Sequence, residues 1–275
     1  VGFAKQLAAF GDFYVNDAFG TAHRRHASTA VIASYFPEHK ALGLLMAEEI
    51  RNISKVLDDI QHPYVAIIGG AKVSSKINIL RNLADKVDHL IIGGGMVFTF
   101  IKAQGGSIGS SLVEEGMLSE ALEILKVCEQ HGVKVNFPID SVCSDRFGAD
   151  ATIKTCHTNS IDDGFMGLDI GPQAINQFQE IIMRAKTILW NGPMGIFEMS
   201  AFKEGTRQIA LSVAASTKAG AFSLVGGGDS VAAINTFHLA DEISYVSTGG
   251  GAMLEYMEGV ILPGIAAIEE NQPAL

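Results

Sequence analysis

The feature that most constrains this fold is a short apolar run ending on adjacent glycines, which the sequence repeats four times. The stretches are VAIIGGAKV (65–73), LIIGGGMVF (90–98), AFSLVGGGDSVAAI (221–234) and YVSTGGGAML (245–254). Each is typical of a strand buried on both faces that stops where a helix begins. Glycine lets another group approach the main chain, and a helix start offers free N–H groups. Tight turns and close helix–sheet packing also use glycine, but four such junctions favour a ligand site.

Apolar runs and segments of helical period alternate along the chain. This alternation predicts an α/β fold, a doubly wound parallel sheet of the Rossmann-like kind, with the glycines at the carboxyl edge where such sheets bind ligands. The predicted strands are 13–15, 65–68, 89–92, 133–137, 187–190, 222–225 and 245–247. The predicted helices are 41–59, 74–86, 115–131, 173–184, 202–217 and 230–237.

The pattern changes before residue 61, which indicates more than one domain. We expect residues 1–38 to be the end of an amino-terminal domain and 39–60 to be an interdomain helix. A second domain is then expected over 61–256, with a carboxyl-terminal tail over 257–275 that returns towards the first. The chain begins inside an apparent helix and without Met, so we expect it to be part of a larger protein.

The composition excludes several classes of protein. A net charge of −10 argues against a nucleic-acid surface, which needs a basic patch. No apolar run reaches the ~18 residues of a membrane span, and no signal peptide is evident. Three widely spaced cysteines argue against a zinc site or a disulfide framework. We therefore expect reduced thiols, a cytoplasmic location and neither nucleic acid nor membrane as a partner.

Two common nucleotide motifs do not match. In GGAKVSSK, Lys72 follows Gly70 too closely for GxxxxGK[ST], and GGGMVF, GGGDSV and GGGAML lack the third glycine of GxGxxG. A hydride-transferring enzyme is therefore the weaker candidate.

Charged and polar residues beside the glycines suggest phosphate chemistry. Lys72 and Lys76 would share one face of the helix that follows IIGG, although both could be solvated surface lysines. Asp229 could cap a helix or hold Mg²⁺ beside a polyphosphate. The hydroxyls of Ser230 and Thr248 could donate to phosphate or stabilise helix starts.

The stretch TILWNGPMGIFE at 187–198 ends a predicted strand in a rigid Asn-Gly-Pro turn. Glu198, seven residues after Asn191, could accept hydrogen bonds from ribose hydroxyls.

Seven stretches together resemble the phosphoglycerate kinase family, in order and over essentially the whole chain. They are YVNDAFGTAHRRHAS, IIGGAKVSSKI, IIGGGMVFTF, MGLDIGP, WNGPMGIFE, VGGGDSVAAI and VSTGGGAMLEYMEG. The resemblance implies a two-domain glycolytic kinase, a transferase that moves a phosphoryl group between 1,3-bisphosphoglycerate and ADP, giving 3-phosphoglycerate and MgATP. It also implies Mg²⁺ with ATP or ADP as cofactor, and a monomer.

The resemblance assigns roles by position. It implies phosphate-binding lysines at Lys72 and Lys76, and transfer chemistry that also involves Gly228 and Gly251. Asn191 would contact phosphate, Glu198 the ribose, and Asp229 the metal. The implied nucleotide-binding residues are Gly70, Ala71, Lys76, Gly94, Gly95, Gly167, Leu168, Asn191, Glu198, Gly227, Gly228, Asp229 and Ser230. Gly249, Gly250 and Gly251 would open a helix aimed at the transferring phosphate.

The residues that would bind the acid substrate match the family less completely. Arg24 matches an arginine that grips phosphoglycerate, and His62 stands where the family usually has an arginine before proline. The family's first part, with its other acid-substrate residues, has no counterpart here. The chain is therefore either part of a full kinase or a nucleotide-binding fragment without catalysis, and a dehydrogenase is a weaker third reading. We also expect Ile261, Leu262 and Ile265 to be exposed, giving self-association or a mobile tail.

Overall fold

The computed structural model describes residues 1–148 and 150–269. The chain divides into two compact units, one formed by Val1–Asp59 with the segment from Ser247 onward, the other by Ile60–Val246. The larger unit thus ends at Val246 rather than at residue 256, and the predicted connecting helix groups with the smaller unit. One reason is that Glu49, buried in that helix, accepts hydrogen bonds from the Ser247 hydroxyl at 2.8 Å and the Thr248 N–H at 2.7 Å.

A parallel sheet of six strands forms the centre of the larger unit within the described residues. Its order is β13-β12-β11-β3-β4-β6, and every neighbouring pair is parallel. The strands are β3 (Tyr64–Ile68), β4 (His89–Ile92), β6 (Lys134–Asn136), β11 (Thr187–Asn191), β12 (Phe222–Val225) and β13 (Tyr245–Val246). The predicted fold class is confirmed.

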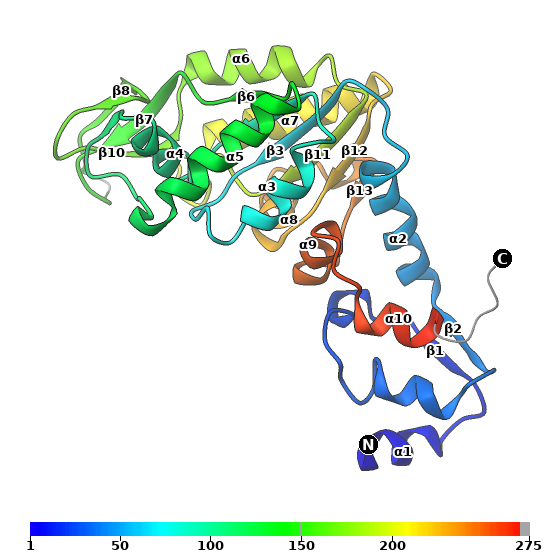
Figure 1. Cartoon of the computed structure of the whole chain (residues 1–275). Helices are drawn as coiled ribbons and strands as arrows, with labels where there is room; N and C mark the ends of the chain where they lie inside the picture. Colours follow the sequence, from blue (N-terminus) through cyan, green and yellow to red (C-terminus); the bar gives the residue numbers. More distant parts are fainter. Residues whose placement is uncertain (149, 270–275) are drawn as a thin grey trace. The chain divides into compact units, whose positions relative to one another are not determined.

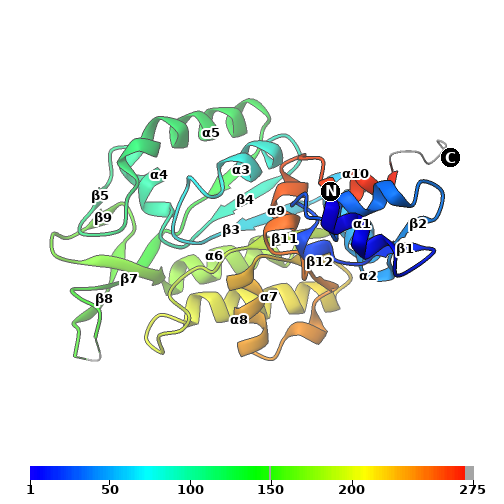
Figure 2. The same cartoon turned by 90° about the horizontal axis from the view of Figure 1, so that it is seen from below.

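Helices cover both faces of this sheet. They are α3 (Ile77–Leu83), α4 (Val97–Ala103), α5 (Leu118–Gln130), α6 (Pro172–Ile182), α7 (Glu204–Lys218) and α8 (Gly228–Thr236). Figure 2 shows α3, α4 and α5 on one face and α6, α7 and α8 on the other. All five residues of β3 and all five of β11 are buried, as strands covered on both faces should be.

The strand order reverses direction between β3 and β11. From β3 the chain adds β4 and β6 on one side, and later adds β11, β12 and β13 on the other. The connections that follow β3 and β11 therefore lead to helices on opposite faces of the sheet, and the edge where they part is the usual ligand position in open α/β sheets.

A second, antiparallel sheet lies at one end of the larger unit, on the left in Figure 1. Its order is β10-β7-β8, with β7 at Asp140–Ser144, β8 at Ile153–His157 and β10 at Met166–Ile170. A small parallel pair, β5 (Ser107–Ile108) and β9 (Ser160–Ile161), adjoins it through β8. None of these strands was predicted from the sequence.

The smaller unit contains the short β1–β2 pair and several helices. Its elements are α1 (Gly2–Ala8), β1 (Tyr14–Asn16), β2 (Lys40–Leu42), α2 (Leu44–Leu57), α9 (Gly251–Met257) and α10 (Pro263–Glu269). Short 3₁₀ turns lie at Phe19–Thr21 and Val31–Tyr35 here, and at Glu115–Met117 and Ala240–Glu242 in the larger unit.

The expectation of an uncovered tail was wrong for two of its three residues. Leu262 and Ile265 are buried, and only Ile261 is exposed, at 80%. The reason is that α10 packs on β2 and the Val31–Tyr35 turn. Lys40 also donates to the Ala267 carbonyl at 2.7 Å.

No helix within the described part of the chain is long and apolar enough to span a membrane. The three cysteines form no disulfide; Cys128 and Cys143 are buried, and Cys156 is partly exposed.

Candidate functional site

Loops from four strands of the larger unit meet around one cavity of about 510 Å³ at the carboxyl edge of the sheet. The loops follow β3, β4, β11 and β12, so the cavity spans the point where strand order reverses. It is lined by Gly70, Ala71, Gly94, Gly95, Ser110, Leu112, Phe147, Met166, Gly167, Leu168, Pro193, Gly195, Ile196, Glu198 and Asp229. Eight of the residues that the sequence singled out are thus brought together here: Gly70, Ala71, Gly94, Gly95, Gly167, Leu168, Glu198 and Asp229.

A lysine and a buried amide join the two sides of the crevice. Lys76, after β3, donates to the side-chain oxygen of Asn191, the last residue of β11. The Asn191 amide nitrogen donates in turn to the Gly226 carbonyl at 2.7 Å, which fixes the loop after β12. An ammonium group is therefore held where β3, β11 and β12 end.

The lysines do not lie on a helix face, contrary to the prediction. The helix α3 begins at Ile77, so Lys72 and Lys76 belong to the loop that precedes it. Lys72 is exposed and Lys76 is partly buried. The segment Ser74–Lys76 turns too tightly to continue as an α-helix, and the Lys76 N–H donates to the Val73 carbonyl at 2.8 Å.

The glycines serve two purposes. At Gly69 a Cβ atom would lie 2.2 Å from the Pro193 carbonyl oxygen, so glycine is needed there for loop-to-loop packing. At Gly228 an added Cβ would meet nothing within 4 Å, so this main chain is open to a ligand. Packing and ligand access therefore both explain the repeated strand–glycine junctions.

Asp229 lies in the first turn of α8, exposed on the cavity. The N-cap of that helix is Gly227. Asp229 is therefore not the helix cap, which was the alternative to a role in holding Mg²⁺. Ser230 is fully buried, and its hydroxyl accepts the Gly192 N–H at 2.6 Å. This bond holds the Asn-Gly-Pro turn, which is a different role from the expected donor to phosphate.

The opposite wall comes from β10 and the loop after β11. The Gly167 main chain is covered by Phe98, whose ring would lie 2.1 Å from an added Cβ. The Ile196 N–H donates to the Leu168 carbonyl at 3.0 Å, which closes the wall.

Beneath this wall lies a buried carboxylate that sequence reasoning missed. Asp169 accepts hydrogen bonds from the Gly205 N–H at 2.7 Å and the Ile170 N–H at 2.9 Å. Burial raises the pKa of the Asp169 carboxyl to about 7, and the nearby charge of Glu204 acts in the same direction.

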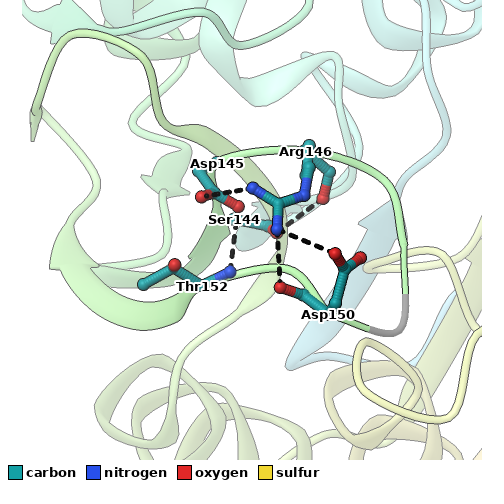
Figure 3. Close-up of polar contacts among 5 residues, drawn as sticks. All are labelled: Ser144, Asp145, Arg146, Asp150 and Thr152. Carbon is teal, nitrogen blue, oxygen red and sulfur yellow. Dashed lines mark hydrogen bonds and ion pairs between the residues drawn. The ribbon is translucent and has the colours of Figure 1, made fainter.

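The β7–β8 turn brings an aromatic side chain to the cavity. Phe147 lines the cavity, and the turn that carries it is held by Arg146, which contacts Asp145 at 3.2 Å and Asp150 at 3.1 Å (Figure 3). The Asp145 carboxylate also accepts the Thr152 N–H at 2.9 Å. Phe147 was not predicted as a site residue because neither of these strands was predicted, although an aromatic residue in a polar turn was a usable signal.

His62 does not belong to this site, which corrects the substrate role expected for it. It precedes β3 and contacts Asp88, just before β4, at 2.6 Å, so both residues lie at the amino-terminal edge of the sheet. Burial of Asp88 alone would raise its carboxyl pKa. Hydrogen bonds from the Tyr64 N–H and from His62 outweigh that effect and lower it. His62 therefore orders the strand starts, at the opposite edge from the cavity.

Several predicted residues lie in the smaller unit: Arg24, Thr248, Gly249, Gly250 and Gly251. Arg24 is exposed, and its Nε atom donates to His23 at 3.2 Å. A Cβ atom at Gly251 would lie 3.7 Å from the same His23 ring. Arg24 and Gly251 thus flank one histidine, and Gly251 is not part of the unit that contains Gly228.

Comparison with known proteins agrees with this geometry. The family model "Phosphoglycerate kinase" matches residues 2–260. The phosphoglycerate kinase of Porphyromonas gingivalis is 53% identical over 268 residues, which are 97% of this chain and 64% of that protein. That of Synechococcus elongatus is 50% identical over 268 residues, 98% of this chain and 66% of that protein. The chain thus spans about two thirds of the length of these relatives.

Solved structures give the same result. Phosphoglycerate kinase from Coxiella burnetii matches with a TM-score of 0.92 and 43% identity, over 98% of this chain and 68% of that one. Phosphoglycerate kinase from Pyrococcus horikoshii matches with a TM-score of 0.81 and 29% identity, over 96% of this chain and 65% of that one. The chain belongs to the phosphoglycerate kinase family.

Proposed function

We propose that the cavity binds ADP or ATP with Mg²⁺, and that the chain serves phosphoryl transfer between 1,3-bisphosphoglycerate and ADP in glycolysis. The observation that carries this proposal is the position of Lys76 and Asn191 between β3 and β11, beside a cavity of nucleoside size. Membership of the family supports the choice of substrates.

The base and the phosphates would bind at different ends of the site. Glycine main chain at Gly94, Gly95 and Gly167, with Leu168, offers a flat apolar slot for adenine. The carboxylate of Glu198 is placed for the ribose hydroxyls. Lys72, Lys76 and the open main chain at Gly228 would neutralise phosphate oxygens.

The residues present fit a magnesium ion that arrives with the nucleotide. Asp229 offers a hard carboxylate oxygen to the cavity, which Mg²⁺ prefers. Within the described residues no group of three or more His, Cys, Asp or Glu side chains could hold a metal. The nucleotide phosphates would supply further ligands, and the ion would neutralise charge on the transferring phosphoryl group.

The reaction asks the protein for alignment and charge neutralisation rather than covalent chemistry. Lys76 is held by Asn191, and Asn191 by Gly226, so the ammonium group is fixed before a ligand arrives. Arg24 is proposed to grip the acid substrate. A cytoplasmic location and a monomeric state stay predictions from the sequence and the resemblance.

A second proposal is that the 275-residue chain alone binds MgADP without turnover. The observation that favours it is the position of His62, which lies at the edge of the sheet opposite to the cavity. Of the two residues predicted to bind the acid substrate, Arg24 alone then keeps that role.

Isothermal titration calorimetry tests nucleotide binding directly. The chain should bind MgADP at one site, and NADH should fail to compete, because the dinucleotide fingerprint is absent. A Lys76→Ala variant should bind MgADP at least about tenfold more weakly, the loss expected for a charge-assisted contact. Equal binding of MgADP and NADH, or no effect of Lys76→Ala, would contradict the proposal.

A further inference from the structure

The loop that carries both lysines is tied to one carboxylate outside it. Glu114 accepts the Ser74 N–H at 3.0 Å on one oxygen and the Ser74 hydroxyl at 2.6 Å on the other. The Val73 N–H also donates to this carboxylate, and the charge of Lys72 lies near it. Glu114 therefore contacts the centre of the segment between Lys72 and Lys76.

Glu114 is itself anchored to a rigid element. Its N–H donates at 3.1 Å to the hydroxyl of Thr99, a residue of α4 that is buried. Partial burial acts to raise the pKa of the Glu114 carboxyl, but the bonds from Ser74 and Val73 and the charge of Lys72 outweigh it and lower that pKa. The group is therefore ionised at neutral pH and accepts all of its hydrogen bonds.

The same segment also reaches the slot proposed for the base. Leu112, two residues before Glu114, lines the cavity and would lie 3.4 Å from a Cβ atom at Gly95. The stretch 110–114 thus connects the apolar end of the site with the lysine loop.

We propose that Glu114 is a positioning residue, which holds the loop of Lys72 and Lys76 in the conformation that receives the phosphates of a nucleoside diphosphate. It acts through Ser74 and Val73 and touches no ligand. This inference rests on the proposed function, because it assumes that the lysines meet phosphate.

The neighbouring residue provides a matched control. Glu115 is also a carboxylate, but it pairs with Lys102 at 2.6 Å on the surface rather than with the lysine loop. A change at Glu115 alters the charge of this region without releasing the loop.

The test is calorimetric titration of the 275-residue chain with two probes, MgADP and adenosine. Glu114→Ala should weaken MgADP binding about tenfold to a hundredfold, the range for bonds to a charged acceptor, and adenosine binding by less than about twofold. Glu114→Gln keeps one acceptor oxygen, so its MgADP affinity should lie between that of Glu114→Ala and that of the unaltered chain. Glu115→Gln should leave both affinities unchanged. Circular dichroism checks that each variant is folded, and Glu114→Gln keeps the test available if Glu114→Ala unfolds.

A double-mutant comparison with Lys72 distinguishes a residue that positions the lysine loop from one that only stabilises the fold. In a Lys72→Ala background, Glu114→Ala should cost clearly less MgADP affinity than in the unaltered chain, since one of the held groups is already gone. Equal losses for MgADP and adenosine, or full additivity with Lys72→Ala, would overturn the proposal. If the unaltered chain binds adenosine but not MgADP, the proposed function fails, and this inference fails with it.

Discussion

Two neighbouring glycines, Gly94 and Gly95, respond differently to the addition of one carbon atom. Gly94 has φ +67°, and a Cβ atom there would lie 2.6 Å from the main chain of Gly70. At Gly95 an added Cβ would meet Leu112 and Ala71 at 3.4 and 3.5 Å, which are ordinary contacts. Substitution at Gly94 would therefore disturb the backbone, whereas substitution at Gly95 narrows the cavity.

This difference gives the first prediction. Gly94→Ala should lower the free energy of unfolding by about 2 kcal/mol or more, because of the strained φ and the overlap. Gly95→Ala should change it by less than about 0.5 kcal/mol yet weaken MgADP binding about tenfold. Urea denaturation and calorimetry measure the two quantities. Normal MgADP affinity in a folded Gly95→Ala variant would remove Gly95 from the site.

The second prediction concerns Asp229. Asp229→Asn should weaken MgADP binding about tenfold while changing ADP binding in EDTA by less than about twofold, because only the metal-dependent contact is lost. Asp241→Asn, an exposed carboxylate outside the cavity lining, is the control. Equal losses with and without the metal would show that Asp229 does not meet Mg²⁺.

Single residues were predicted where glycine, lysine and aspartate follow an apolar strand. Gly94 and Asp229 both line the cavity, because the carboxyl ends of parallel strands meet at one edge. Gly167 also lines it, but it lies within the antiparallel strand β10 and was assigned from the resemblance. The role expected for His62 came from the resemblance, whereas its position before β3 puts it at the opposite edge of the sheet, one strand length away. Sequence could not reveal Asp169, whose partners depend on tertiary contacts.

At the scale of elements, Asp169 connects β10 to the start of α7. The same first turn of α7 supports the cavity, because the Thr206 hydroxyl accepts the N–H groups of Met194 at 3.1 Å and Gly195 at 3.2 Å. The buried carboxylate therefore fixes a helix that holds part of the cavity wall.

The third prediction follows from its pKa. The carboxyl has a pKa of about 7 in the folded chain against an ordinary value of 3.8, so the folded state holds the proton more tightly. The stabilisation that comes from the protonated Asp169 carboxyl is fully present below pH ~4 and is lost as the pH rises through about 7. Relative to Asp169→Asn, the unaltered chain should lose up to about 4 kcal/mol of unfolding free energy between pH 4 and pH 8, at about 1.4 kcal/mol per pKa unit. Urea denaturation of both proteins across this range measures the difference. A difference that does not change with pH would contradict the raised pKa.

Elements were predicted best where burial on both faces makes an apolar run. The strands at 89–92 and 222–225 have the predicted bounds. The β8 strand was missed because IKTCH is half-exposed and not apolar, with exposed and partly buried residues alternating. The helix α4 was missed because five of its seven residues are buried, so it lacks an amphipathic period.

At the scale of the whole molecule, we predict that the chain binds nucleotide but turns substrate over slowly. In a coupled assay of ATP formation, the 275-residue chain should turn over 1,3-bisphosphoglycerate at least about a thousandfold more slowly than the Porphyromonas gingivalis relative, of whose length it spans 64%. A single arginine at a transferring phosphoryl group is worth about 10³-fold or more in related reactions, so even one acid-substrate contact that the chain does not supply would give a loss of this size. A rate close to that of the relative would show that Arg24 and the other residues of this chain suffice for turnover, which would contradict the prediction.

The cavity at the carboxyl edge of the six-stranded sheet is proposed to receive ADP. A crystal structure of the chain grown with MgADP tests it most directly. We expect adenine between Gly94 and Gly167–Leu168 and ribose at Glu198. The phosphates should lie at Lys72, Lys76 and Gly228, with the metal beside Asp229. Nucleotide bound elsewhere at full occupancy, or an empty cavity at saturating MgADP, would contradict it.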